Sequence, residues 1–157
     1  MPISPTRLHY SAEQIVWQEV PGEVALAYTI TGCPVGCKGC HSVDSWPVGS
    51  GEPLTQEHLQ QQLQKYRGLI SCVLFLGGEW QPTALLKLLK QVKNEGLETC
   101  LYTGYENVSL ALREQLTYLK TGPWIAARGG LESPTTNQRF YDLRTQQLLN
   151  CEFQTGE

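Results

Sequence analysis

The residues of this sequence best suited to chemistry are three cysteines, Cys33, Cys37 and Cys40, with the spacing C-x3-C-x2-C. Thiolates are soft ligands that suit zinc, copper(I) and iron–sulfur clusters. Glycines before and between the cysteines let the backbone fold tightly enough for three sulfurs to face one point. A closed zinc site or an ordinary electron-transfer cluster needs four ligands. A four-iron cluster held by three cysteines leaves one iron open, so the spacing indicates chemistry at a metal.

Other metal sites remain as alternatives. His41 could complete a Cys3His zinc site, although it adjoins Cys40 and zinc ligands usually have two or more residues between them. Cys72, Cys100 or Cys151 could be the fourth ligand of a cluster, although ferredoxin-like sites use local cysteine runs. Cys72 and Cys100 lie in apolar segments, where buried and inert thiols are expected. Nothing around Cys151 indicates an activated thiol.

Composition limits the function classes. The chain has 157 residues, of which 41% are hydrophobic and 17% charged. This predicts a single domain over residues 1–157, with 1–13 and 142–157 as peripheral extensions. A net charge of -3 argues against a broad nucleic-acid surface, and no apolar run is long enough to cross a membrane. The lopsided cysteine spacing and an N-terminus unlike a secretory signal favour a reducing cytoplasm.

Strand, glycine loop and helix alternate along the chain, which predicts an α/β fold with a mostly parallel sheet and helices outside. Four or five such units are too few for a closed eight-stranded barrel, so we expect an open or partial βα barrel. Strands are expected at residues 23–30 (the first strand), 72–76, 97–102 and 118–120, and helices at 55–66, 83–94 and 108–116.

Three loops follow the predicted strands and carry the unusual residues. Residues 31–51 contain the three cysteines, Gly77-Gly78-Glu79 follows the second strand, and Thr103-Gly104-Tyr105 follows the third. Parallel α/β sheets bind ligands at the carboxyl ends of their strands. If the strands are neighbours, these loops therefore converge on one site.

The cysteine spacing after a first strand resembles the radical S-adenosylmethionine (radical SAM) enzymes. The resemblance implies that Cys33, Cys37 and Cys40 hold one 4Fe–4S cluster, whose open iron is chelated by the amino and carboxylate groups of S-adenosylmethionine. It also implies that backbone around Gly39, Cys40 and His41 contacts the adenine. No catalytic side chain is implied beyond the cluster and the cofactor.

A second motif of that superfamily is a Gly-Gly-Glu-Pro loop. Here the loop is Gly77-Gly78-Glu79-Trp80, with the proline displaced to position 82. The two glycines would allow close approach of the methionine amino group, and Glu79 would accept a hydrogen bond from that ammonium. Trp80 departs from the pattern and leaves the path of this loop open.

Further segments resemble the activating proteins of anaerobic (class III) ribonucleoside-triphosphate reductases, over about residues 14–141. These are residues 18–23, 31–33, 39–42, 103–105 and 118–138. The resemblance implies that an electron entering the cluster cleaves S-adenosylmethionine, and that the resulting 5'-deoxyadenosyl radical takes hydrogen from a glycine of the reductase. A flavodoxin-like protein is the implied electron donor.

Weaker candidates surround this predicted site. Tyr102 and Tyr105 could flank the adenosine, although strand tyrosines usually pack against neighbours. Lys120 could face the cofactor carboxylate, although a lysine at a strand end is usually a solvated rim charge. Residues that could contact the partner are Arg128, Gly129, Gly130, Asn137 and Gln138 at a rim, with Trp46 and Trp124 as anchors or core residues.

Three other functions stay open. The first is a small-molecule radical enzyme such as a deazaguanine synthase, although we find no carboxylate cluster for a magnesium ion. The second is an activase for another glycyl radical enzyme, such as pyruvate formate-lyase. The third is a zinc-binding interaction module. About four irons with four sulfides, against about one zinc, separate the radical enzymes from the zinc module.

Overall fold

The computed structural model describes residues 8–17, 19–31, 52–105, 108–122, 125, 127–131, 133–150 and 153. One sheet runs through this part of the chain, and its strands and helices have the following bounds. The strands are β1 (Leu8–Val16), β2 (Ala25–Ile30), β3 (Glu52–Leu54), β4 (Cys72–Leu76), β5 (Glu98–Tyr102), β6 (Tyr118–Thr121), β7 (Arg139–Asp142) and β8 (Gln147–Leu148), and the helices are α1 (Gln56–Lys65), α2 (Pro82–Asn94) and α3 (Leu110–Glu114).

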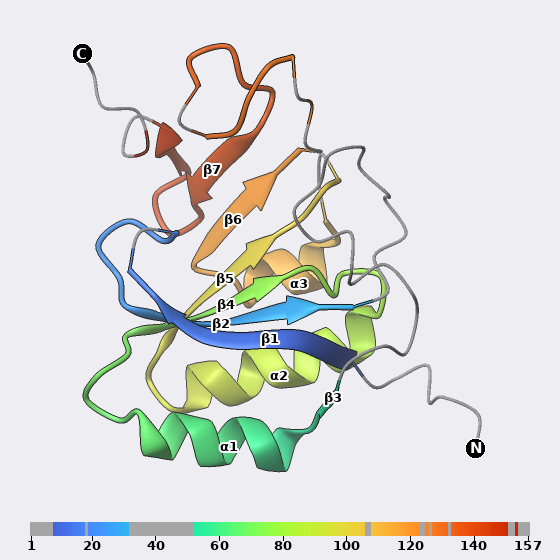
Figure 1. The fold of residues 1–157 in the computed structure, drawn as a ribbon, viewed down its shortest axis with the longest axis vertical. Coiled ribbons are helices and arrows are strands. Elements are labelled where there is room, and N and C mark those ends of the chain that lie inside the picture. Colours follow the sequence, from blue (N-terminus) through green and yellow to red (C-terminus); the bar gives the residue numbers. More distant parts are fainter. Residues whose placement is uncertain are drawn as a thin grey trace.

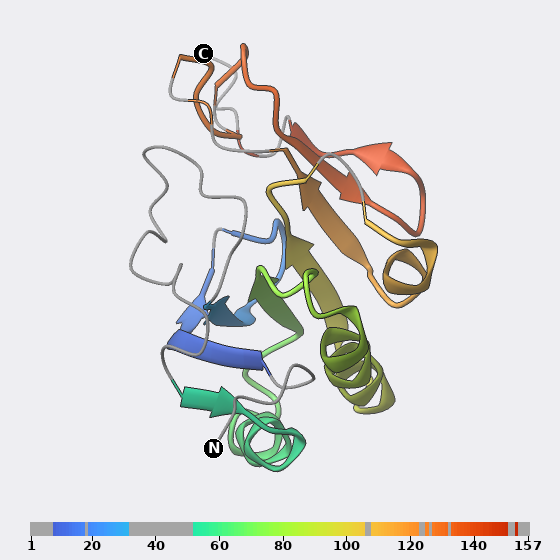
Figure 2. The ribbon, with the colours of Figure 1, turned by 90° about the vertical axis from the view of Figure 1, so that its right-hand side faces the viewer.

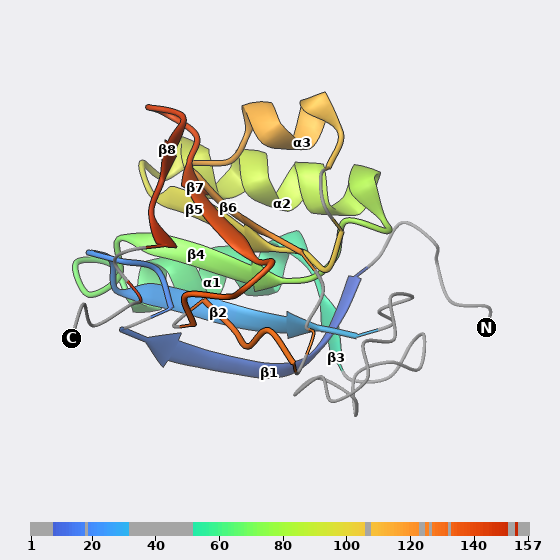
Figure 3. The same cartoon turned by 90° about the horizontal axis from the view of Figure 1, so that it is seen from above.

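The sheet is mixed, with the strand order β3-β1-β2-β4-β5-β6-β7-β8. Its four central strands, β2, β4, β5 and β6, are parallel, and helices precede or connect them as predicted. Antiparallel pairs flank this centre on both sides, so the sheet is parallel in the middle rather than throughout. The two antiparallel edges lie at opposite ends of the sheet (Figure 1, Figure 3). Closure toward a partial barrel stays a prediction.

In chain order, the first strand is β1. The strand that was expected to be first, at residues 23–30, corresponds to the second strand, β2. Residues 8–13, expected in a peripheral extension, form most of β1, and Leu8 is only 1% exposed. The pairing of β1 with β2 shifts register between Tyr10 and Ala12. Such a bulge interrupts the two-residue alternation that identifies a strand in a sequence. The strands β3 and β8 have only three and two residues, so they are too short to show a strand pattern in the sequence.

The helices begin and end where local chemistry allows. The side chain of Thr55 caps α1 by accepting a hydrogen bond from the backbone N–H of His58 at 3.0 Å. Pro82 is the first residue of α2, where a missing N–H costs nothing. The helix expected at residues 108–116 is shorter, because α3 covers Leu110–Glu114. Figure 2 shows the three helices on one side of the twisted sheet.

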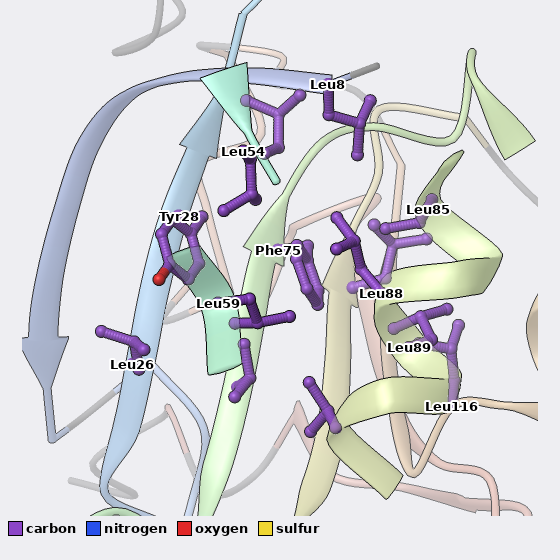
Figure 4. Close-up of a cluster of buried hydrophobic side chains, with 14 of the residues drawn as sticks. Leu8, Leu26, Tyr28, Leu54, Leu59, Phe75, Leu85, Leu88, Leu89 and Leu116 are labelled. Carbon is purple, nitrogen blue, oxygen red and sulfur yellow. The ribbon is translucent and has the colours of Figure 1, made fainter. Parts of the chain in front are cut away.

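Both faces of the central strands are buried, as their continuous apolar runs predict. On the helix side, the rings of Tyr28 and Phe75 stack with centroids 6.1 Å apart. Figure 4 shows Leu59 of α1 beside them, with Leu88 and Leu89 approaching from α2. The opposite face carries smaller side chains together with the aromatic residues Tyr118 and Phe140, and no helix of the described chain packs on it. Its buried core consists of Val16, Val20, Ala25, Ala27, Cys72, Leu74, Cys100, Tyr118, Leu131 and Phe140.

Candidate functional site

The carboxyl ends of β2, β4 and β5 are neighbours, which is the condition that the predicted convergence of their loops requires. Thr29 of β2 pairs with Leu76 of β4, and Leu76 pairs with Tyr102 of β5. Thr31, which follows β2 at this same edge, is the last described residue before the cysteine segment. The predicted site residues Cys33, Cys37, Cys40, Gly39 and His41 lie outside the described residues.

The Gly77-Gly78 turn leaves β4 with a backbone that favours glycine at both positions, since φ is +103° at Gly77 and +110° at Gly78. A Cβ on Gly77 would lie 2.6 Å from the ring of Trp80, so this ring occupies the space of a side chain. The N–H of Gln81 donates to the carbonyl of Gly78 at 3.0 Å and closes the turn before α2. Trp80 therefore stabilises the loop where the superfamily pattern has proline.

Glu79 occupies the centre of this edge. Its Oε1 accepts a hydrogen bond from the Thr103 hydroxyl at 2.8 Å, which joins the loop after β4 to the loop after β5. Its Oε2 is buried and has no hydrogen-bond donor among the described residues. Burial raises the pKa of the Glu79 carboxyl, while hydrogen bonds from its own backbone and Thr103 and the charge of Lys120 oppose the increase. A donor that carries positive charge would satisfy this oxygen.

The sequence did not indicate the role of Thr103, although Thr103 begins the Thr103-Gly104-Tyr105 loop. Its hydroxyl donates to Glu79 and accepts from the N–H of Tyr105 at 3.1 Å, and its own N–H donates to the carbonyl of Lys120 at 2.9 Å. Thr103 is 1% exposed, so these bonds are shielded from water. Its position directly after a strand, level with the Gly-Gly-Glu loop, was the only available signal.

Tyr102 and Lys120 lie side by side in β5 and β6. The Lys120 ammonium stands 5.3 Å from the centroid of the Tyr102 ring. The Tyr102 hydroxyl donates to the backbone carbonyl of Glu19, and its ring meets that of Phe140 edge-on at 6.1 Å. These contacts give Tyr102 a part in packing, and its contact with adenosine stays a prediction.

The segment after β6 folds back against the edge. A Cβ on Gly122 would lie 3.1 Å from the carbonyl oxygen of Asn137, and φ at Gly122 is +99°. The side chain of Gln138 donates to the carbonyl of Gly122 at 3.4 Å. Gln138 is buried at 4% exposure, so it does not offer its side chain to a partner as we had expected.

The other rim candidates are distributed unevenly. Arg128 is exposed and Gly130 is buried. Tyr105, which was expected beside the adenosine and not at the rim, is 42% exposed next to the Thr103 turn. Trp46 and Trp124 lie outside the described residues.

Cys72 and Cys100 are free thiols buried on the face opposite the helices, as expected of inert cysteines. Burial raises the pKa of both thiols, which keeps them protonated. Within the described ranges, no group of three or more His, Cys, Asp or Glu side chains could hold a metal ion. No helix among these residues is long and apolar enough to span a bilayer.

Comparison with known proteins bears on the undescribed segment. A family model described as a 4Fe–4S single cluster domain matches residues 20–139, which include all three clustered cysteines. The chain belongs to this family. This membership favours an iron–sulfur cluster over structural zinc.

Two curated relatives share part of this region. A pyruvate formate-lyase-activating enzyme of Clostridium pasteurianum is 32% identical over 116 residues, which are 68% of this chain and 48% of the relative. The pyruvate formate-lyase 1-activating enzyme of Escherichia coli (strain K12) is 32% identical over 78 residues, 46% of this chain and 32% of that enzyme. The chain thus spans about half, or less, of the length of these relatives. The similarity relates part of this chain to enzymes that activate pyruvate formate-lyase.

Proposed function

We propose that this protein is a radical SAM activase that forms a glycyl radical on an anaerobic ribonucleoside-triphosphate reductase. Cys33, Cys37 and Cys40 hold one 4Fe–4S cluster, and backbone at Gly39 and His41 contacts the adenine. When bound, a reduced cluster would supply the one electron for cleavage of S-adenosylmethionine to methionine and the 5'-deoxyadenosyl group that takes hydrogen from a glycine Cα. Glycine suits this reaction because no side chain blocks close approach.

The observation that carries this proposal is the buried Oε2 of Glu79, which lacks a donor among the described residues. The second oxygen of the same carboxylate is oriented by Thr103. The α-ammonium of S-adenosylmethionine has both the donors and the charge that this oxygen requires. The unpaired carboxylate oxygen at this edge therefore fits the amino group of the cofactor. It belongs to the loop after β4, the strand that pairs with β2 before the cysteine segment begins.

Within this proposal, Glu79 binds and orients the methionine group while the Gly77-Gly78 backbone approaches it closely. The helix-free face of the sheet receives the glycine loop of the partner, in the manner of a partial barrel open on one side. A flavodoxin-like carrier supplies electrons, and the reaction takes place in the cytoplasm. The choice of the reductase is supported by the resemblance of residues 118–138, a segment within which Gly122 packs against Asn137.

A second candidate is an activase for pyruvate formate-lyase. The specific observation in its favour is the 32% identity with two enzymes whose names give that activity. Both candidates use the same cofactors and differ only in the protein that carries the glycine.

The first experiment is anaerobic. The protein is reconstituted with iron and sulfide, reduced with dithionite and mixed with S-adenosylmethionine, and 5'-deoxyadenosine and methionine are measured. We expect product from the wild type and none from Cys33→Ala, Cys37→Ala or Cys40→Ala. Cys72→Ala is the matched control, because this buried thiol lies at the amino end of β4, away from Gly77.

Incubation with each candidate partner and detection of the glycyl radical by electron paramagnetic resonance then separates the two activities. A radical on the reductase alone supports the proposal, and a radical on pyruvate formate-lyase alone replaces it with the second candidate. Stoichiometric zinc without product would refute both.

A further inference from the structure

The outward face of α2 carries a lysine stripe, formed by Lys87, Lys90 and Lys93, and all three side chains are exposed. The three lysines recur every third residue, so they share the side of the helix that points away from the core. The helix buries its opposite face through Ala84, Leu85, Leu88, Leu89 and Val92. The lysine stripe is therefore a surface of one charge sign on the side of the sheet that carries the helices (Figure 2).

The stability of α2 does not explain the lysine stripe. The helix contains no Asp or Glu, whereas α1 carries both signs of charge in Glu57 and Lys65. Lysines three residues apart repel one another and weaken a helix slightly. The helix dipole favours a cation in the last turn, which accounts for Lys93 but not for Lys87 or Lys90.

The described neighbours of α2 do not neutralise these charges. Glu95, the first acidic residue after the helix, pairs with Arg67 at 3.6 Å and accepts a hydrogen bond from Gln60. On the side of α1, Gln91 donates to the carbonyl of Gln56 at 2.8 Å and to the side chain of Gln60 at 3.0 Å. None of the ion pairs between described residues includes a lysine of the stripe. The stripe thus presents positive charge to solvent in a chain whose net charge is -3.

The lysine stripe begins near the edge of the sheet that carries the candidate site. The N–H of Gln81 donates to the carbonyl of Gly78 at 3.0 Å, and α2 starts at the next residue, Pro82. Lys87 follows Pro82 by five residues, which places it about 8 Å along the helix axis. A small domain is about 30 Å across, so one that docks on Lys87 and Lys90 also extends past the start of the helix to this edge.

The two sides of the sheet offer separate surfaces to two partners. The proposed function assigns the helix-free face to the glycine loop of the protein that is activated. A second protein, which delivers electrons, must then reach the same edge from another direction. The lysine stripe lies on the opposite side, where the helices pack (Figure 2).

We propose that Lys87, Lys90 and Lys93 form the docking surface for an acidic, flavin-containing electron carrier. The inference rests on the proposed function, because that reaction needs one electron from outside the protein. In the encounter, a reduced flavin of the carrier is oxidised by one electron, and this electron reduces the cluster proposed at the three cysteines. Complementary surface charges accelerate such an encounter and disfavour partners of the wrong charge.

The test measures binding of a purified, acidic bacterial flavodoxin to the reconstituted protein under anaerobic conditions by biolayer interferometry. The variant is the double substitution Lys87→Gln with Lys90→Gln. We expect it to raise the dissociation constant about fivefold at an ionic strength of about 0.01 M, chiefly through slower association. The difference should shrink at about 0.15 M, where the Debye length falls from about 30 Å to about 8 Å.

Two further double variants serve as controls. Lys87→Arg with Lys90→Arg keeps both charges and should bind like the wild type. Lys65→Gln with Arg67→Gln removes the same net charge from the exposed end of α1, near the amino end of β4, and should leave binding nearly unchanged. Cleavage of S-adenosylmethionine driven by dithionite, a small reductant that needs no docking surface, should be equal in all variants and the wild type.

The outcomes separate the docking proposal from the proposed function. Equal weakening by the two Gln double variants would overturn docking on the stripe, because net charge alone would then explain the effect. Unchanged flavodoxin binding in the variant at Lys87 and Lys90, or weaker binding of the activated protein instead of flavodoxin, would also overturn it. Dithionite-driven cleavage by the wild type leaves the proposed function standing in each of these cases. Absence of that cleavage would refute the proposed function itself, whatever the binding result.

Discussion

The contact between Thr103 and Glu79 predicts a stability change that depends on pH. The replacement Thr103→Val keeps the shape of the side chain and removes the hydroxyl that donates to Oε1 of Glu79 at 2.8 Å. Because Oε2 already lacks a donor among the described residues, the variant leaves the buried carboxylate with the backbone N–H of Glu79 and without the Thr103 hydroxyl. We therefore expect the protein to lose stability chiefly where Glu79 is ionised.

The magnitude follows from the charge of the acceptor. A hydrogen bond to an ionised group contributes about 1.5–3 kcal/mol, and one to a neutral group about 0.5–1.5 kcal/mol. Burial raises the pKa of Glu79 in the folded protein above its value in the unfolded chain. The folded state thus binds more protons there, and the free energy of unfolding falls as pH rises between the two pKa values. Removal of the Thr103 bond raises the folded pKa further, so the decrease becomes larger and extends to higher pH.

The assay is urea unfolding of the protein without cluster or cofactor, followed by tryptophan fluorescence between about pH 5 and pH 8. We expect Thr103→Val to lose about 1.5–3 kcal/mol at the upper end of this range and less at the lower end. Thr103→Ser keeps the donor and serves as the matched control. Glu79→Gln removes the ionisable group, so it should flatten the pH dependence and weaken the binding of S-adenosylmethionine.

Two results would refute this reasoning. One is a loss in Thr103→Val that is equal at every pH, which would make the contact independent of the Glu79 charge. The other is the same loss when Thr103→Val is introduced into Glu79→Gln, because a neutral amide gains less from the hydroxyl.

Two further predictions concern local structure and use the same unfolding assay. Gly122→Ala should destabilise the protein by about 1–3 kcal/mol, because φ is +99° and the new Cβ meets the Asn137 carbonyl at 3.1 Å. It should cost more than Gly96→Ala, where φ is +78° and nothing lies within 4 Å; equal costs would contradict the steric argument. Thr55→Ala should cost about 1 kcal/mol through loss of the cap to the His58 N–H, whereas Thr55→Ser should cost little. A neutral Thr55→Ala would show that packing alone holds α1.

Several elements could be predicted from the sequence because their signals are local. The run from Cys72 to Leu76 is apolar at every position, and the structure buries it on both faces as β4. Thr55 was expected as a helix cap, and its side chain forms that cap. The spacing of Cys33, Cys37 and Cys40 indicated a metal cluster, and membership of a 4Fe–4S single cluster family agrees with it.

Other features depended on residues far apart in the chain. No local pattern marks β1, because its bulge breaks the alternation and its place in the sheet is defined by pairing with β2 and β3. Likewise, Gln138 looks like a rim residue in the sequence, and it is buried because the chain returns to the Gly122 carbonyl.

The candidate site shows the same division. The sequence determines which groups are available: three thiols at cluster spacing, a Gly-Gly-Glu loop, and a lysine near the end of a strand. Only the tertiary structure decides that Glu79 has one oxygen held by Thr103 and the other buried without a donor in the described chain, and that Lys120 stands over Tyr102. The reason is physical, since hydrogen bonding, burial and charge depend on distances between atoms that separate strands bring together.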